Sequence, residues 1–360
     1  MIQSGSFSGS YHKDDVQFLL EPIQMAFTPL ALKEKLIQSG RMHYSDMLSQ
    51  EAAPTQYHLD IFNQSLNQNL PRMATEVMQI ARELVKSIQN KTIVLVSLVR
   101  AGVPLGVMLH QTLKAMGKES VHYGISIIRD RGIDNTALEY IESQHGTDGI
   151  VFVDGWTGKG AISHELTRAL KNRSGYPAQP RLVVLTDLCG CAWLAASDDD
   201  WLIPFGIMGA PVSGMISRSV WSAEGFHGCM KCDHLQEYEC SNMLVNKVRL
   251  YCEQLKNSSL PDINYKSADN QQRWELSQKI ITKLSKNYHI NNLNRIKPGI
   301  AEATRAVLRR VPEHVLVRSY DDPDVALLIK LAKEKNITVT EAGDNLGRYR
   351  AITIIKKVGK

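Results

Sequence analysis

Residues 151–162, VFVDGWTGKGAI, place an acid, a hydroxyl group and a cation at the end of an apolar stretch. Asp154 follows the apolar residues, and a glycine-rich turn then leads into a helical pattern. The free N–H groups of such a turn, together with the helix dipole, form a cradle for a phosphate group. Asp154 can accept hydrogen bonds from the two hydroxyls of a ribose. The candidate phosphate ligands are Thr157, Gly158, Lys159, Gly160 and Ala161.

The spacing of the glycines excludes two common nucleotide-binding motifs. A Walker A loop needs a glycine five residues before Gly158 and a Ser or Thr after Lys159, but Val153 and Gly160 stand there. A dinucleotide fingerprint needs G-x-G-x-x-G, which these glycines do not match. Two interpretations stay open at this point. The segment is either a phosphoribosyl-diphosphate loop, or a plain glycine-rich turn in which Asp154 starts the helix.

A second strand–turn–helix pattern lies in VSLVRAGVPLGVML, residues 96–109. A diphosphate is bound by backbone amides together with an arginine fork. The candidate ligands are Ser97, Arg100, Ala101 and Gly102. On its own, the motif also fits a tight turn with a surface arginine. Two such loops about fifty residues apart in one sheet favour paired phosphate sites.

The polar stretch RDRGIDNTALEYI, residues 129–141, follows a predicted strand. Transfer of a phosphoribosyl group passes through an oxocarbenium-like state, from which water must be kept away. We expect a closing loop in which Arg129 and Arg131 cover the leaving diphosphate. A solvated charged turn would have the same pattern.

Other segments offer further candidates. His43, Tyr44 and Ser45 form either a hood over an acceptor substrate or a helix cap. Ser213 and Arg218 fit either a second anion site or a capped turn. Four cysteines could hold a structural zinc, with a redox role as another alternative, but one pair has a C-x-C spacing that suits a zinc knuckle poorly. We expect ordinary thiols at Cys189, Cys191, Cys229 and Cys232.

These motifs need a sheet to bring them together. Short apolar runs alternate with amphipathic stretches, which predicts an α/β fold with a parallel sheet and helices on both faces. Ligands of such sheets bind at the carboxyl ends of the strands. The expected strands are 92–97, 121–128, 149–153 and 181–187, and the expected helices are 71–89, with Pro71 in the first turn, 104–117 and 161–172.

A chain of 360 residues exceeds one ordinary hydrophobic core, which predicts two domains. We expect a main domain at 1–255, with 1–70 as its hood, then a linker and helix at 256–295. A small α/β domain follows at 296–360, with helices at 299–310 and 322–336 and strands at 314–319, 337–342 and 350–357. No apolar run approaches the 18 or so residues that span a bilayer, and the first residues lack a signal-peptide core. We expect a cytoplasmic protein without a membrane partner.

Charge is unevenly placed along the chain. Residues 291–360 carry 14 Lys/Arg against 8 Asp/Glu, an excess of +6, whereas the whole chain has a net charge of +5. The C-terminal segment is therefore either a polyanion-facing module or an ordinary basic surface. The candidate RNA contacts are Lys297, Gly299, Glu302, Arg305, Arg309 and Arg310.

The chain resembles a family of phosphoribosyltransferase-like proteins from bacterial tellurite-resistance and stress gene clusters, also labelled StiP. The resemblance lies in SGSYHKDDVQFLL, SGRMHYSDMLSQE, SLVRAGVPLG, VDGWTGKGAI and SGMISRSVW. The C-terminal unit resembles the Pelota-type RNA-binding domain that accompanies this family. Asp154 is flanked by Val153 and Gly155, whereas phosphoribosyltransferases usually have two adjacent acids here.

The resemblance implies a type I phosphoribosyltransferase core. It would transfer a phosphoribosyl group from Mg²⁺-bound phosphoribosyl diphosphate to an unknown acceptor, with RNA bound by the C-terminal domain. A non-catalytic sensor of a phosphoribosyl metabolite is the alternative. The family label of cysteine protease is a third, but no spacing in the sequence marks a nucleophile with its base. A homodimer stays open.

Overall fold

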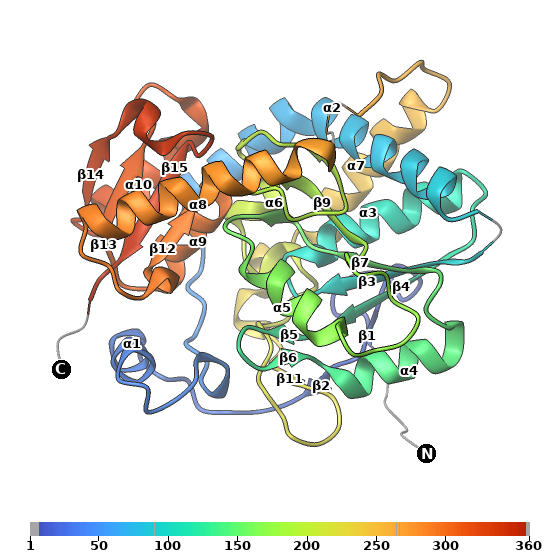
Figure 1. Cartoon of the computed structure of the whole chain (residues 1–360), viewed down its shortest axis with the longest axis horizontal. Coiled ribbons are helices and arrows are strands. Elements are labelled where there is room, and N and C mark those ends of the chain that lie inside the picture. The colour runs from blue at the N-terminus through green and yellow to red at the C-terminus, as the bar shows by residue number, and fades with distance from the viewer. Residues whose placement is uncertain (1–6, 90, 264, 266, 358–360) are drawn as a thin grey trace.

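The computed structural model describes residues 7–89, 91–263, 265 and 267–357. Its centre is a parallel sheet in the order β1–β4–β3–β7–β9–β10, with the short β8 paired to β9 (Figure 1). The expected strands at 92–97, 149–153 and 181–187 lie within it, whereas the one expected at 121–128 ends in this sheet at Ile125. β3 and β4 pair in register from Ile93 beside Ser120 to Leu98 beside Ile125. The strands are β1 Gln17–Phe18, β3 Ile93–Leu98, β4 Ser120–Ile125, β7 Ile150–Val153, β8 Trp156–Thr157, β9 Leu182–Asp187 and β10 Leu194–Ser197.

Both faces of this sheet are buried, which explains its uninterrupted apolar strands. In β3, Ile93 and Leu95 belong to one core cluster, whereas Val94, Val96 and Leu98 belong to the other. Successive side chains of a strand point to opposite faces, so each face receives every second residue. The expected α/β fold with helices on both faces is confirmed.

Helices cover both faces. One side is packed by α2 Gln56–Ser87, α3 Gly102–Ala115 and α7 Ser241–Leu255, and the other by α4 Asn135–His145 and α5 Ala161–Leu170. The prediction that Pro71 begins a helix is wrong: it lies inside α2, which starts at Gln56 with Thr55 as its cap. Its apolar stripe, including Met73 and Leu84, is fully buried and holds the helix on the sheet.

The expected closing loop at 129–141 is for the most part ordered structure. Ile127–Ile128 (β5) pairs with Gly132–Ile133 (β6), and α4 begins at Asn135. Asp134 caps this helix by accepting from the N–H of Ala137 (3.0 Å). An Asp at this position satisfies one of the free N–H groups of the first turn, which the prediction overlooked.

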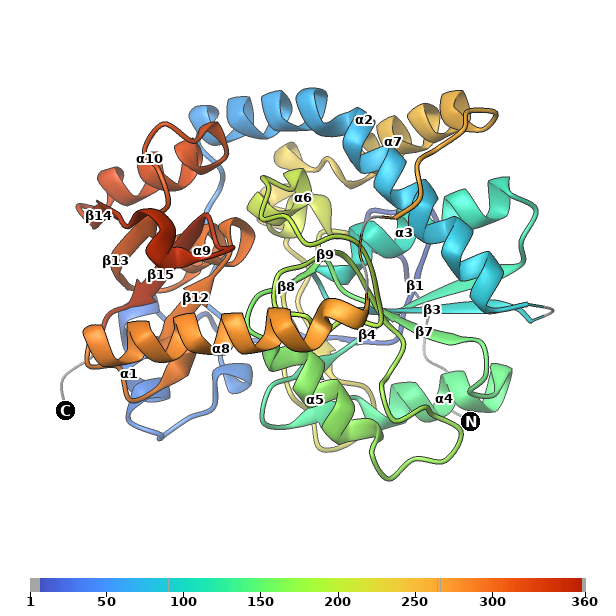
Figure 2. The same cartoon turned by 45° about the horizontal axis from the view of Figure 1, so that its top comes forward.

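The C-terminal domain has its own sheet in the order β12–β15–β13–β14. Its elements are β12 Ile296–Pro298, α9 Ile300–Arg309, β13 Pro312–Val317, α10 Ala326–Glu334, β14 Thr338–Glu341 and β15 Ala351–Ile355. A long helix, α8 Asn270–Asn287, crosses from the main sheet to this domain (Figure 2). The Ser277 and Tyr349 hydroxyls are 2.6 Å apart and join α8 to the domain.

An N-terminal excursion wraps beneath the C-terminal domain (Figure 1). It contains β2 Glu21–Pro22, which pairs with β11 Gly228–Cys229, and α1 Leu30–Gln38. Glu34, which is fully buried, accepts hydrogen bonds from Arg310 of the C-terminal domain. The short helix α6 Pro204–Ile207 contacts α9 from the main domain. The two domains therefore share a boundary on several sides.

Asp200 is the main polar anchor of that boundary. Its carboxylate accepts from the N–H of Ile300, at the start of α9 (2.8 Å), and from the N–H of Arg350 (2.7 Å). Burial raises the pKa of Asp200 to about 7, although these two hydrogen bonds favour the charged form. An acid at a helix N-terminus also meets the positive end of the helix dipole. Asp200 thus fixes how α9 faces the main domain.

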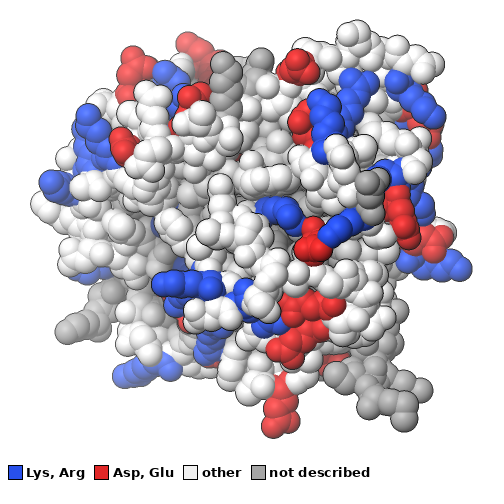
Figure 3. Space-filling model, turned by 45° about the vertical axis from the view of Figure 1, so that its right-hand side comes forward, with Lys and Arg blue, Asp and Glu red and all other residues white. Residues whose placement is uncertain are grey.

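Within the described residues, no helix is long and apolar enough to cross a membrane. The charged side chains on the face in Figure 3 are of both signs and lie interspersed.

We predict that Asp200→Asn flattens the pH dependence of stability. Because burial raises the folded-state pKa above that of the unfolded chain, the carboxyl group stabilises the fold fully below its unfolded pKa. That contribution is lost as the pH rises to about 7. Between pH 4 and pH 7.5 the wild type should lose about 2–4 kcal/mol of unfolding free energy relative to the variant. Urea unfolding at several pH values measures the difference, and parallel curves for the two proteins would contradict it.

Candidate functional site

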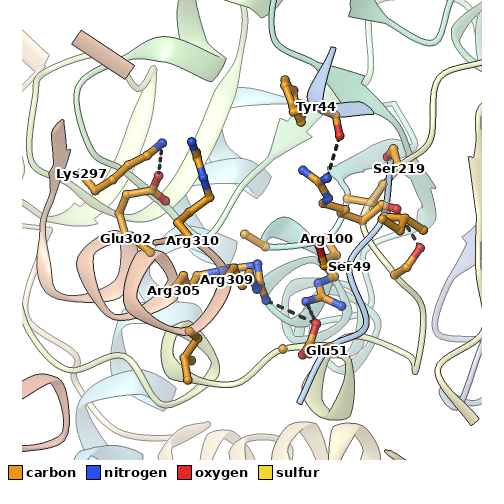
Figure 4. A pocket seen from close by; sticks show the side chains of 18 of the residues that line it. Tyr44, Ser49, Glu51, Arg100, Ser219, Lys297, Glu302, Arg305, Arg309 and Arg310 are labelled. Atoms are coloured by element: carbon orange, nitrogen blue, oxygen red, sulfur yellow. Dashed lines mark hydrogen bonds and ion pairs between the residues drawn. The ribbon is translucent and has the colours of Figure 1, made fainter. Parts of the chain in front are cut away.

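A cavity of about 640 Å³ lies between the two domains. Its walls come from the ends of β3 and β7, the segments around Glu51 and Cys232, and α9 of the C-terminal domain. Figure 4 shows the α9 side chains on one side of this pocket and Arg100 with Glu51 on the other. The carboxyl ends of parallel strands therefore do face a pocket, as the sequence predicts.

The lining of the pocket is strongly basic. Among the described residues, eleven cationic side chains line it, against three acids, Glu51, Asp154 and Glu302. The cationic residues are Lys33, Arg100, Arg129, Lys159, Arg218, Lys231, Lys297, Arg305, Arg309, Arg310 and Lys335. This lining favours an anionic ligand.

Glu51 organises the wall opposite α9. It forms an ion pair with the buried Arg100 and lies 3.8 Å from Arg309, and it accepts from the N–H of Ala210 (2.8 Å). Burial would raise the pKa of Glu51, but the charges of Arg100 and Arg309 outweigh it and lower the pKa to about 2. Glu51 is therefore ionised at every physiological pH and holds one arginine from each domain.

The expected 5′-phosphate loop lines the pocket, but much of it is engaged by the C-terminal domain. Lys159 donates to the carbonyls of Leu293 and Ile296, and the Gly158 carbonyl accepts from Tyr349 (2.8 Å). The Thr157 hydroxyl is bound to Asp187. Burial lowers the pKa of Lys159 well below its ordinary value. Ala161 and Gly160 also line the pocket.

Asp154 lies at the end of β7 and lines the same pocket. One of its oxygens accepts from the N–H of Gly155 (2.8 Å). Burial raises the pKa of Asp154 to about 7, a change that the hydrogen bond and Arg305 only partly offset.

The second loop is split between the pocket and the core. Arg100 and Ala101 line the pocket, whereas Ser97 is fully buried and donates to the carbonyl of Gly102 (3.1 Å). Gly102 is required by space, because a Cβ there would lie 2.0 Å from the carbonyl oxygen of Val153. The two loops predicted as neighbours thus touch through Gly102.

The remaining predicted residues divide in the same way. Arg129, Tyr44 and Arg218 line the pocket, and Arg218 donates to the carbonyls of Tyr44 and Met47. Arg131 instead pairs with Asp46 and lies over the ring of Trp221. The other candidates serve local structure: His43 caps a 3-10 helix at Tyr44–Asp46, Ser45 is buried beside it, and Ser213 donates to the carbonyl of Gly209.

The candidates for RNA contact in β12 and around α9 face inward rather than outward. Lys297, Glu302, Arg305, Arg309 and Arg310 all line the interdomain pocket. Lys297 pairs with Glu302 (3.3 Å). Gly299, with φ of 90°, begins α9 against Leu188 and is needed for that turn.

The described residues contain no cluster of three or more His, Cys, Asp or Glu side chains that could hold a metal ion. Cys232 lines the pocket, whereas Cys189 and Cys191 lie next to Asp187 and Cys229 is fully buried. The expectation of Mg²⁺ at the site stays untested.

Among the lining residues that the sequence did not predict are Lys33, Glu51, His58 and His234. Glu51 is separated by 49 positions from its partner Arg100, and no sequence pattern connects the two. His234 follows the C-x-x-C segment by two residues, and this proximity was the only sequence feature that pointed to it.

Comparison with known proteins assigns both parts of the chain. Residues 9–249 match the family described as "Tellurite-like stress resistance cysteine protease StiP", and residues 275–357 match the "PELOTA RNA binding domain". A protein of Acinetobacter baylyi (strain ATCC 33305 / BD413 / ADP1) named "Cysteine protease StiP" is 49% identical over 376 residues. The match covers 100% of this chain and 97% of that protein.

These names correct the expected activity. Both the family and the relative are described as cysteine proteases, so the prediction of a phosphoribosyltransferase is wrong. The glycine-rich loop misled the prediction because a strand–turn–helix cradle occurs in many α/β proteins of unrelated chemistry. The chain belongs to the StiP family and carries a C-terminal Pelota RNA-binding domain.

Proposed function

We propose that this protein is a thiol-dependent peptidase of a stress-resistance system, with Cys232 as its nucleophile. The observation that carries the proposal is the position of this thiol. Among the described residues, Cys232 is the one cysteine in the lining of the interdomain pocket. The pocket has the size of an ordinary ligand site, and its other walls come from both domains.

Two histidines of the same lining are candidate bases. The Nε2–H of His58 donates to the carbonyl of Ile207 (2.8 Å), and that of His234 donates to the carbonyl of Glu51 (2.9 Å). A carbonyl only accepts, so Nε2 carries a proton in both rings, and Nδ1 is the nitrogen that would take up the thiol proton. Burial lowers the pKa of His58, which keeps this ring neutral at pH 7.

Cys232 needs such a base. Burial raises the pKa of the Cys232 thiol to about 11, although the charge of Arg100 acts in the opposite direction. The resting thiol is therefore protonated, and the thiolate is the reactive form. Transfer of the thiol proton to an imidazole would generate the nucleophile, as in other Cys–His pairs.

The reaction then follows from this pair. The sulfur bonds to the peptide carbonyl carbon, the C–N bond breaks, and the leaving amine takes the proton from the imidazolium. Water hydrolyses the thioester, which releases the acid and restores the thiol. The guanidinium groups of Arg100 and Arg309 supply the nearby positive charge for the oxyanion.

We predict that Cys232→Ser abolishes hydrolysis of fluorescein-labelled casein, with a loss of at least 100-fold, because a serine at this site lacks an acidic enough proton. Cys191→Ser is the matched control. Cys191 is half-buried, and both it and a histidine, His164, border Gly160. A Cβ built on that glycine would lie 2.8 Å from the Cys191 sulfur and 3.6 Å from His164 Cε1. Full activity of the Cys232 variant, with loss in the Cys191 variant, would move the nucleophile to Cys191 and contradict the proposal.

Substitution of the two histidines identifies the base. If His58 is the base, His58→Gln lowers kcat at least 100-fold, and the acidic limb of the wild-type rate profile lies below pH ~6.5 because burial lowers its pKa. If His234 is the base, His234→Gln shows the loss instead. Retention of full activity in both variants would rule out the imidazole mechanism.

A further inference from the structure

The basic wall of the pocket contains more positive charge than its acids balance. Glu51 is shared by Arg100 and Arg309, Glu34 pairs with Arg310, and Glu302 pairs with Lys297. Within the described residues, Arg305 forms no ion pair and donates no hydrogen bond. Its guanidinium carbon lies over the ring of Trp156, 5.2 Å from the ring centroid. Arg305 is thus a half-buried cation that forms no ion pair within 4 Å, although Glu302, Glu51 and Asp154 lie near enough to favour its charged form.

The neighbouring cations also repel one another. Burial lowers the pKa of Arg305 to about 10, and the charge of Arg100 adds to this effect. Burial, with the charge of Arg305, lowers the pKa of Arg309 well below its usual range. Burial and the charge of Arg218 lower the pKa of Lys33 to about 7. Like charges brought together out of water cost free energy, which a bound anion would offset.

The geometry of these cations suits phosphate better than a single carboxylate. The lining holds eight more Lys and Arg residues than Asp and Glu residues in about 640 Å³. Glu34 and Asp130 outside the lining balance Arg310 and Arg129, and the remaining excess favours a ligand of several negative charges. Guanidinium groups bind phosphate oxygens in pairs, and a cavity of this size holds a ligand of nucleotide dimensions. Arg305 and Arg309 both come from α9, within the part that matches an RNA-binding domain.

We propose that the pocket binds the phosphate groups of a nucleotide, either free or at the end of an RNA strand. Arg305 and Arg309 of the C-terminal domain contact the phosphate from one side, and Arg100 and Arg218 of the main domain contact it from the other. The site goes beyond the proposed peptidase activity and does not depend on it. Because both domains contribute phosphate contacts, binding of the nucleotide depends on how the two domains are joined.

Binding should be measured by calorimetry in the full chain with Cys232→Ser, so that failure of the peptidase mechanism leaves the result unaffected. The probes are ADP, pyrophosphate, and a ten-nucleotide RNA with either a 5′-phosphate or a 5′-hydroxyl. A twelve-residue poly-glutamate peptide tests the competing class of ligand. We expect ADP or the 5′-phosphorylated RNA to bind, at least tenfold more tightly than the 5′-hydroxyl RNA and the peptide.

Arg305→Gln should weaken this binding 10-fold to 100-fold, since it removes charged hydrogen bonds to phosphate. Arg318→Gln is the matched control from the same domain, because Arg318 is exposed and pairs with Asp344 (2.9 Å). It should change the affinity less than twofold. Arg305→Gln should also unfold at a temperature no lower than the parent protein without ligand, because it removes an unbalanced charge.

Binding of ADP identifies a free nucleotide as a ligand, and binding of the phosphorylated RNA alone identifies a strand end; either supports the site. Four results would overturn it: no phosphate probe binds, ADP fails to bind while the two RNA ends bind equally, the peptide binds most tightly, or the Arg305 and Arg318 variants behave alike. A second variant, Arg218→Gln, guards against a local effect at α9 and should show a comparable loss.

Discussion

Asp200 determines the geometry on which the pocket depends. This buried carboxylate holds the first N–H of α9 and the N–H of Arg350, and it thereby fixes the C-terminal domain against the carboxyl ends of the main sheet. Glu302, Arg305 and Arg309 of α9 then point into the cavity (Figure 4). Asp200 acts together with the Glu34–Arg310 pair and the contact of α6 with α9 to place Arg305 and Arg309 opposite Arg100.

The boundary between the two domains explains two features that have no evident relation within either domain alone. In the main domain, Glu51 and Arg100 form a half-site with Cys232 beside it; in the C-terminal domain, α9 carries a row of arginines. Brought together, they enclose a thiol within a strongly cationic cavity. A peptidase with such a pocket would favour negatively charged substrates or regulators, because the positive electrostatic potential of the lining attracts anions.

The sequence was sufficient for the sheet but not for the site. Alternation of apolar strands with helices predicted β3, β7 and β9 within a few residues, because burial on both faces leaves a strong local pattern. The glycine-rich turn was located correctly, yet its ligand was misjudged: Lys159 is taken up by carbonyls of another domain. The Arg100–Glu51 pair and the inward orientation of α9 depend on long-range packing, and no local pattern encodes such contacts.

Charge-selective alkylation will show whether Cys232 is a reachable thiol in a cationic pocket. Iodoacetate and iodoacetamide both alkylate a cysteine sulfur, but only iodoacetate is charged. The ratio of their reaction rates at one cysteine therefore reports the electrostatic potential there. Peptide mass spectrometry measures this ratio for each cysteine. Cys191 serves as the internal reference. The account predicts that Cys232 is modified, with a ratio shifted at least tenfold towards iodoacetate relative to Cys191. Failure of Cys232 to react, or equal ratios at the two sites, would contradict it.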